Sequence, residues 1–190
     1  MSGFGESKKL TTPFSLDDYV TEVRNFITTC NIDGYDILAH SFGGRIAMRL
    51  ALNDCRAQKI VLTGSAGLKP KRKFSYYYKV YCYKILKRFL PTKALKNFGS
   101  SEYKSLDEVM KKSYLKIVNE HQDKEVKDIK NPTLIIYGEK DSETPVYMAK
   151  RLNKYIKNST LRIIKGAGHF AFIDNPFAFN LYLKEFLLGD

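Results

Sequence analysis

A single serine stands between a short apolar run and a pair of glycines in the segment 39–44 (AHSFGG). A serine in this setting is typical of a sharp turn from a strand into a helix, which presents the hydroxyl to a substrate. Such a turn requires small residues two positions before and two positions after the serine, because larger side chains would collide across it. Ala39 and Gly43 meet this requirement, although glycine is more usual at the first position. The pattern predicts that Ser41 is a nucleophile.

The second group that such a serine needs is a base, and the sequence holds three histidines. A serine hydroxyl is a poor nucleophile at neutral pH, so an imidazole must take its proton and a carboxylate must orient that imidazole. His121 lies in a charged central segment, and the turn is expected to direct the side chain of His40 elsewhere. His169 follows an apolar run and lies among small residues. We therefore predict that His169 is the base.

Acidic residues that follow a predicted strand are the candidates for the orienting carboxylate. Asp141 and Glu139 come just after the apolar run 133–137, and the carboxyl ends of parallel strands form the edge where active sites lie. We prefer Asp141, with Glu139 as the alternative, and either could instead cap the next helix. Asp36 precedes its strand and is expected at the opposite edge, whereas Asp174 is a candidate cap of the last helix.

Helix-like and strand-like apolar patterns alternate along the chain, which predicts a parallel sheet built from βαβ units. The spacing of Ser15 and Asp18 resembles a capping box and marks the start of the first helix. The expected helices cover about 15–30, 44–53, 106–118, 146–156 and 177–187, and the expected strands cover 37–39, 59–63, 133–137 and 161–164.

The segment between the second and third expected strands is strongly basic. Residues 68–130 contain 17 Lys and Arg against 7 Asp and Glu, and the whole chain has a net charge of +12. Aromatic and aliphatic residues recur every three or four positions from Phe74 to Phe89, which predicts a helix that Pro91 ends. We interpret residues 68–128 as a helical insertion with solvated lysines. Because no recognition motif accompanies the charge, we expect no nucleic-acid partner.

Length and composition indicate one globular domain with a modest insertion, since the 190 residues are 44% apolar. Three cysteines without a C-x-x-C pair favour neither a disulfide framework nor a zinc site. The sequence shows neither a signal-peptide pattern nor an apolar run of about 18 residues, so no membrane span is indicated. We expect a cytoplasmic protein that uses no cofactor and no metal.

Together these residues resemble the α/β-hydrolase superfamily, in particular its small cytosolic members with a helical cap. Four motifs carry the resemblance, in this order: GFGES at 3–7, AHSFGG at 39–44, YGEKD at 137–141 and GH at 168–169. The resemblance implies a partial α/β-hydrolase fold, in which helices cover both faces of a parallel sheet and a helical cap is inserted. It divides the chain into a core (1–67 and 129–190) and a cap, or lid (68–128). It assigns Ser41 as nucleophile, His169 as general base and Asp141 as the orienting acid.

The resemblance also implies further strands, which precede the 3–7 motif in other members of the superfamily. Their oxyanion hole uses the backbone N–H after the nucleophile, here that of Phe42, and a second N–H from a loop after the third strand. That loop has no counterpart in this sequence. We therefore expect an N-terminally truncated core in which the strand around Ile37 is an exposed edge. A second copy of the chain or a complementing N-terminal segment is the expected partner.

The function that follows from these assignments is that of a serine hydrolase. We expect a carboxylesterase-like reaction on a small apolar ester or a related acyl substrate, with carbon–carbon bond hydrolysis available to the same scaffold. Serine at position 41 argues against the dehalogenase and epoxide hydrolase branches, which use an aspartate nucleophile. The alternative is a truncated, weakly active or inactive hydrolase-like protein with a binding or regulatory role.

Overall fold

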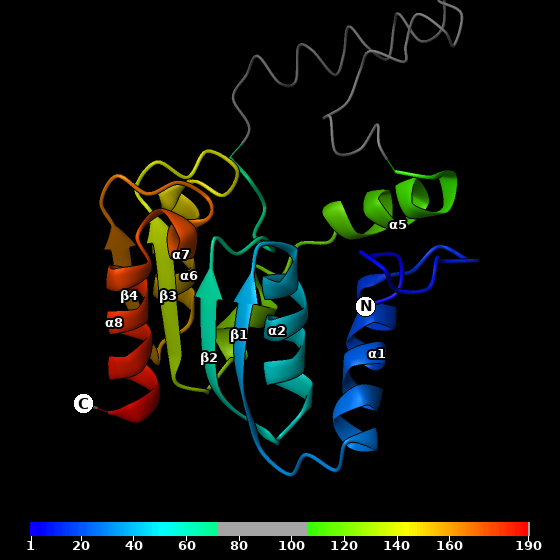
Figure 1. Ribbon diagram of the computed structural model, residues 1–190, viewed down its shortest axis with the longest axis horizontal. Coiled ribbons are helices and arrows are strands. Elements are labelled where there is room, and N and C mark those ends of the chain that lie inside the picture. Colours follow the sequence, from blue (N-terminus) through cyan, green and yellow to red (C-terminus); the bar gives the residue numbers. More distant parts are fainter. Residues whose placement is uncertain (72–105, 190) are drawn as a thin grey trace, which may run out of the picture.

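The computed structural model describes residues 1–71 and 106–189, which form a parallel sheet flanked by helices (Figure 1). Each strand expected from the sequence is present, as are the expected helices that fall within these residues. The helix expected between Phe74 and Phe89 lies outside the described residues. In chain order the elements are α1 (Leu16–Thr29), β1 (Tyr35–His40), α2 (Phe42–Asn53), β2 (Ala57–Thr63), α5 (Glu108–Val118), η2 (Glu125–Asp128), β3 (Thr133–Gly138), α6 (Val146–Tyr155), β4 (Ser159–Ile164), α7 (Ala171–Asp174) and α8 (Pro176–Leu188).

The strands of the described residues stand in the order β1-β2-β3-β4, and every neighbouring pair is parallel. Leu62 of β2 pairs with Ala39 of β1 on one side and with Ile135 of β3 on the other. Every residue of β3 is buried. Because a strand covered on both faces needs no polar side, it reads as a continuous apolar run, and this is the pattern by which the sequence predicted it.

Helices cover both faces of the sheet, as predicted. On one face, Leu62 of β2 belongs to the same buried cluster as Met48 of α2 and Leu152 of α6. On the other face, Val61 of β2 belongs to a cluster with Phe179 of α8. Figure 1 shows α7 and α8 on the opposite side of β3 from α6. The predicted fold class, a partial α/β-hydrolase fold, is confirmed.

An outer layer of helices lies beyond α2. Tyr19 of α1, Ile46 of α2, and Met110 and Ile117 of α5 form one buried cluster. The described part of the segment 68–128 therefore packs on the core through α5, and also through Val126 of η2, which is fully buried beneath α2 and α6. The division of the chain into core and cap at residues 68 and 128 stays a prediction.

The capping box predicted at the start of α1 is confirmed. The Ser15 hydroxyl accepts a hydrogen bond from the backbone N–H of Asp18 at 3.3 Å, and the Asp18 carboxylate accepts one from the backbone N–H of Ser15 at 2.7 Å. These bonds satisfy N–H groups that have no partner inside a helix. The Ser15 N–H and the Ser15 hydroxyl both donate to the Asp18 carboxylate, and they lower the pKa of Asp18 because they stabilise its ionised form.

The strand that leads to Ser41 is an edge of the sheet. Within the described residues β1 pairs with β2 alone. Leu38, at the middle of β1, is 56% exposed. For the part of the chain that the structure describes, the expectation that the strand around Ile37 forms an exposed edge is confirmed.

The fold differs from the prediction in two details. The short helices α7 and η2 were not predicted, because four residues are too few to show a helical period. Asp174 does not cap α8; instead Asn175 accepts a hydrogen bond from the N–H of Ala178, and Pro176 occupies the first turn. Asparagine is a preferred cap and proline is favoured at the first helical position.

No helix in the described residues is long and apolar enough to span a membrane.

Candidate active site

Ser41 lies at the turn between β1 and α2 in a strained conformation. Its φ is 51° and its ψ is −115°, a backbone region that non-glycine residues seldom adopt. The turn is held on both sides, since the N–H of Ser41 donates to Thr63 O at 3.1 Å and Ser41 O accepts from the N–H of Ala66 at 3.0 Å. Strain of this kind costs on the order of 1–3 kcal/mol and persists only where the surrounding structure fixes it.

Close packing explains the glycines after Ser41. A Cβ at Gly43 would lie 3.8 Å from the Cβ of Ala39, an ordinary contact that leaves room for small side chains only. A Cβ at Gly44 would lie 2.7 Å from the Cβ of Ser65, so Gly44 is the position with no room at all. The sequence pattern identified the turn correctly, but the tightest approach is one residue later than expected.

His169 and Asp141 form a buried pair. Asp141 Oδ2 lies 2.9 Å from His169 Nδ1, and the two side chains are 0% and 7% exposed, respectively. Asp141 is itself fixed, because its Oδ1 accepts from the N–H groups of Glu143 and Thr144, at 2.9 and 2.8 Å, and its Oδ2 accepts from the Thr144 hydroxyl at 2.8 Å. A carboxylate only accepts, so Nδ1 carries the proton of the 2.9 Å bond.

The other carboxylates considered from the sequence lie elsewhere. Glu139 accepts a hydrogen bond from the N–H of Gly166 at 3.0 Å, and Asp174 accepts one from the N–H of Gly168 at 2.7 Å. Asp36 accepts one from the N–H of Lys59 near the amino end of β1, as its place in the sequence predicted. Among these predicted acids only Asp141 contacts His169.

His40 packs directly on His169, a contact that the sequence did not predict. The two ring centroids are 4.6 Å apart, and His40 Nε2 donates to the backbone oxygen of His169 at 3.1 Å. Burial lowers the pKa of His40 and outweighs the opposing effect of this hydrogen bond. Gly64 lies beside the same ring: its φ is 49°, and a Cβ there would be 3.0 Å from His169 Nδ1. His40 and Gly64 therefore fix the imidazole of His169 from its other sides.

The second nitrogen of His169 faces a residue that the sequence reasoning missed. Glu143 Oε2 lies 3.3 Å from His169 Nε2, and the Glu143 side chain is 56% exposed. No hydrogen bond of the described residues joins the Ser41 hydroxyl to His169. No sequence pattern marked Glu143, because its approach depends on how the loop after Asp141 folds.

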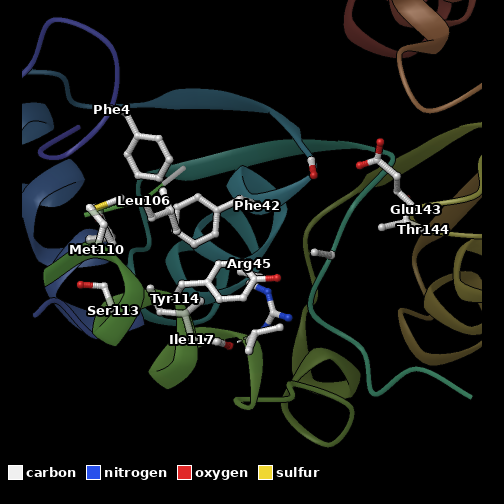
Figure 2. Close-up of a pocket in the computed structure, with 14 residues that line it drawn as sticks. Phe4, Phe42, Arg45, Leu106, Met110, Ser113, Tyr114, Ile117, Glu143 and Thr144 are labelled. Carbon is white, nitrogen blue, oxygen red and sulfur yellow. Dashed lines mark hydrogen bonds between the residues drawn. The ribbon is translucent and has the colours of Figure 1, made fainter. Parts of the chain in front are cut away.

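A cavity of about 570 Å³ opens beside Ser41 (Figure 2). Glu143 and Thr144 lie on one side of it, and Phe4, Phe42 and the side chains of α5 lie on the other. Phe4 stacks on Phe42 with 5.6 Å between the ring centroids, so the 3–7 motif forms part of the apolar wall. The lining residues are Phe4, Tyr19, Ser41, Phe42, Arg45, Ala66, Leu106, Met110, Ser113, Tyr114, Ile117, Val118, Glu143 and Thr144.

Arg45 attaches α5 to the helix that follows Ser41. Its Nη1 donates to Ile117 O, in the last turn of α5, at 3.0 Å and also to Glu120 O, just after that helix. The side chain is buried, and burial lowers its pKa. These bonds hold α5, which forms one wall of the cavity, against α2.

Phe42 is the first residue of α2, so its N–H has no partner within the helix and lies at the positive end of the helix dipole. This N–H makes no hydrogen bond to the described residues and is free to meet a developing negative charge.

Within the described residues, no group of three or more His, Cys, Asp and Glu side chains could hold a metal ion.

A serine in a strained strand-to-helix turn, with a His–Asp pair at the same carboxyl edge of a parallel sheet, defines the α/β-hydrolase type of site. Comparison with known proteins agrees with this class. The alpha/beta hydrolase family matches residues 1–180, and the chain belongs to that family.

Two bacterial relatives match almost the whole chain. The chain is 26% identical to a 2-hydroxy-6-oxo-6-(2'-aminophenyl)hexa-2,4-dienoic acid hydrolase of Metapseudomonas resinovorans, a match that covers 93% of the chain and 68% of the relative. It is 22% identical to a 2-hydroxy-6-oxo-2,4-heptadienoate hydrolase of Pseudomonas putida, with 100% and 77% covered. Among solved structures, a serine hydrolase involved in carbazole degradation is 27% identical, with a TM-score of 0.73 over 100% of the chain and 78% of that structure.

Proposed function

We propose that this chain is a serine hydrolase whose nucleophile is Ser41, whose general base is His169 and whose orienting acid is Asp141. The observation that carries the proposal is the buried 2.9 Å bond between Asp141 and His169 Nδ1, at the edge of the sheet where Ser41 occupies its strained turn. This bond places the proton on Nδ1 and leaves Nε2 as the nitrogen that can accept a proton.

In the proposed reaction the Ser41 oxygen attacks the acyl carbon of the substrate while His169 Nε2 takes the hydroxyl proton. The negative charge that develops on the acyl oxygen is met by the N–H of Phe42. His169 then returns the proton to the leaving group, which departs and leaves an acyl-enzyme. A water molecule, deprotonated by His169, hydrolyses this ester and restores Ser41.

The substrate we propose is a small, largely apolar acyl compound. The cavity volume of about 570 Å³ falls within the range of about 300–1,000 Å³ that is usual for small-molecule sites. Phe4, Phe42 and Met110 give it apolar walls. An ester is the simplest such substrate, and the names of the two dienoate hydrolases favour a carbon–carbon bond beside a ketone as the other kind of bond to test.

A second candidate function is that of a hydrolase-like protein with little or no activity and a binding or regulatory role. Two points favour it. Within the described residues the Ser41 hydroxyl and His169 are not hydrogen-bonded to each other, and the motifs in these residues identify one oxyanion donor, the N–H of Phe42, where the superfamily uses two. Loss of one such donor costs about 10²–10³ in turnover.

A fluorophosphonate probe separates the two candidates, because it reacts only with an activated serine. We expect stoichiometric labelling of the folded protein, located at Ser41 by peptide mass spectrometry and abolished in Ser41→Ala. Ser65→Ala is the matched control, since Ser65 is buried at the same edge of the sheet and we expect its loss to leave labelling in place. Folded protein that is not labelled would favour the inactive alternative.

Turnover then identifies the bond that is cleaved. We expect release of the alcohol from short-chain aryl esters, with no release by Ser41→Ala. A 2-hydroxy-6-oxo-dienoate assayed in parallel reports carbon–carbon cleavage. A preference for the dienoate would replace the ester in this proposal and keep the roles of the three residues.

A further inference from the structure

His169 lies between two carboxylates of one short loop. Asp141 Oδ2 is 2.9 Å from Nδ1, and Glu143 Oε2 is 3.3 Å from Nε2. The Asp141 carboxylate itself shapes this loop, because it accepts the N–H groups of Glu143 and Thr144. The group that orients the base through one nitrogen therefore also positions the carboxylate that meets the other nitrogen.

The hydrogen-bonding capacity of the ring limits what Nε2 can do. A carboxylate only accepts, so the contact with Glu143 exists while Nε2 carries a proton. To take the proton of the Ser41 hydroxyl, Nε2 must first lose this proton, which the Glu143 carboxylate accepts and releases to solvent as it moves away, and Nε2 must then face the serine. Nε2 has a single position for a hydrogen bond, so it cannot contact Glu143 and activate Ser41 at the same time.

The two carboxylates differ in how firmly they are held. The Asp141 side chain is 0% exposed and takes part in three further hydrogen bonds, to the backbone of residues 143 and 144 and to the Thr144 hydroxyl. The Glu143 side chain is 56% exposed, and within the described residues its carboxylate contacts His169 alone. Asp141 is thus a permanent partner, whereas Glu143 can move into solvent at little cost.

We propose that Glu143 is a positioning residue that holds His169 Nε2 while the cavity is empty and leaves it when an acyl substrate enters. This proposal rests on the roles proposed for Ser41 and His169. Glu143 and Ser41 both line the cavity, so a substrate whose acyl carbon reaches Ser41 occupies space beside Glu143. The other titratable ring packed on His169 is His40, whose pKa is lowered by burial, so His40 adds little positive charge beside the base.

The first test compares the rate of fluorophosphonate labelling in Glu143→Ala and in the unaltered protein. An exposed ion pair is weak, so we expect labelling to become faster by only about two- to five-fold. Glu139→Ala is the matched control: it removes a carboxylate from the same loop, but that carboxylate binds Gly166 N–H and not His169. A rate in Glu143→Ala that equals or falls below that of the unaltered protein and of Glu139→Ala would overturn the proposal.

The second test observes the imidazole itself. In protein labelled with ¹⁵N-histidine at neutral pH, we expect the Nε2 signal of His169 to change in Glu143→Ala while the Nδ1–H bonded to Asp141 stays in place; Glu139→Ala should change neither. Unchanged Nε2 signals would refute the contact. This readout does not depend on Ser41. If the fluorophosphonate probe does not label the protein, the proposed function fails, but the ¹⁵N spectra still show whether Glu143 contacts Nε2.

Discussion

The imidazole of His169 is fixed by residues that come from three separate places in the chain. Asp141 bonds Nδ1, His40 packs on the ring face and bonds the backbone oxygen, and Gly64 leaves the space that the ring fills. Each contact removes a way for the ring to turn. An imidazole that is held in this manner loses little further entropy in a reaction, which suits the role of general base that we propose for His169.

Asp141→Asn tests the orienting bond. The amide can donate to Nδ1 as well as accept from it, so the ring no longer has a reason to keep its proton on Nδ1. We expect kcat for ester hydrolysis to fall by about 10³–10⁴, with a much smaller change in KM. Glu139→Gln, which removes the same charge from the same loop, should retain its activity; comparable losses in both variants would show that loop charge and not orientation matters.

His40 predicts a pH dependence of stability. Burial lowers its pKa in the folded protein below the ordinary value of 6.5, so the unfolded chain binds more protons as the pH falls through this region. Stability from this group is therefore present above pH 6.5 and is lost as the pH falls toward the lowered pKa. Urea unfolding at about pH 7.5 and about pH 5.5 measures the loss. In His40→Gln, which keeps a donor and does not titrate, the difference should shrink; an unchanged difference would assign it to other groups.

The loops of the site come together through a close approach of backbone segments as well as through apolar packing. A Cβ at Gly138, the last residue of β3, would lie 2.1 Å from Gly168 O and 2.4 Å from Ala167 O. Both contacts are with backbone atoms, which cannot move aside as a flexible side chain can. The loop that carries His169 therefore passes directly over the end of β3, and glycine at 138 permits it.

Gly138→Ala should accordingly destabilise the protein by about 1–3 kcal/mol, the usual cost of overpacking. Gly43→Ala is the comparison, because Gly43 lies in the first turn of α2 with ordinary contacts and alanine is the better helix former there by up to about 1 kcal/mol. Chemical denaturation measures both. Opposite signs are the expected result, and equal effects would mean that the loop over β3 adapts easily.

Apolar periodicity predicted the strands and long helices because each has a face or a whole length that must be buried. β3 is buried throughout, and α1 begins at the capping box that Ser15 and Asp18 predicted. The short elements α7 and η2 carry no such period. Asp174 was misassigned as a cap because position alone does not distinguish it from its neighbour Asn175, which forms the bond.

Chain order predicted that Asp141 and His169 lie close together. Asp141 and His169 follow strands of a parallel sheet, so topology alone brings them to one edge. The contacts of His40 and Glu143 with the base could not be predicted in the same way, because one depends on ring packing and the other on the turn that the Asp141 carboxylate shapes. Such contacts depend on side-chain geometry, to which sequence patterns are insensitive.

At the scale of the whole molecule, the sheet of the described residues has two edge strands. They are β1, which carries Ser41 at its end, and β4, which lies behind α8 in the view of Figure 1. Two apolar surfaces follow from this architecture: Leu38 on the edge strand is 56% exposed, and Phe177 on α8 is 81% exposed. An open strand edge offers unpaired backbone groups to another chain, and an exposed aromatic residue offers apolar contact.

We therefore expect the protein to self-associate through the edge of β1. A charge placed on β1 or on α8 distinguishes association through that edge from association through α8. Lysine on an edge strand opposes pairing with a second strand, so Leu38→Lys should lower the molar mass measured by light scattering at high protein concentration, or slow aggregation. Phe177→Lys introduces the same charge far from the edge, and we expect it to leave association unchanged. If Phe177→Lys alone disperses the protein, α8 is the contact surface. If neither variant changes the molar mass of a protein that associates, the expectation that β1 is the contact surface is wrong.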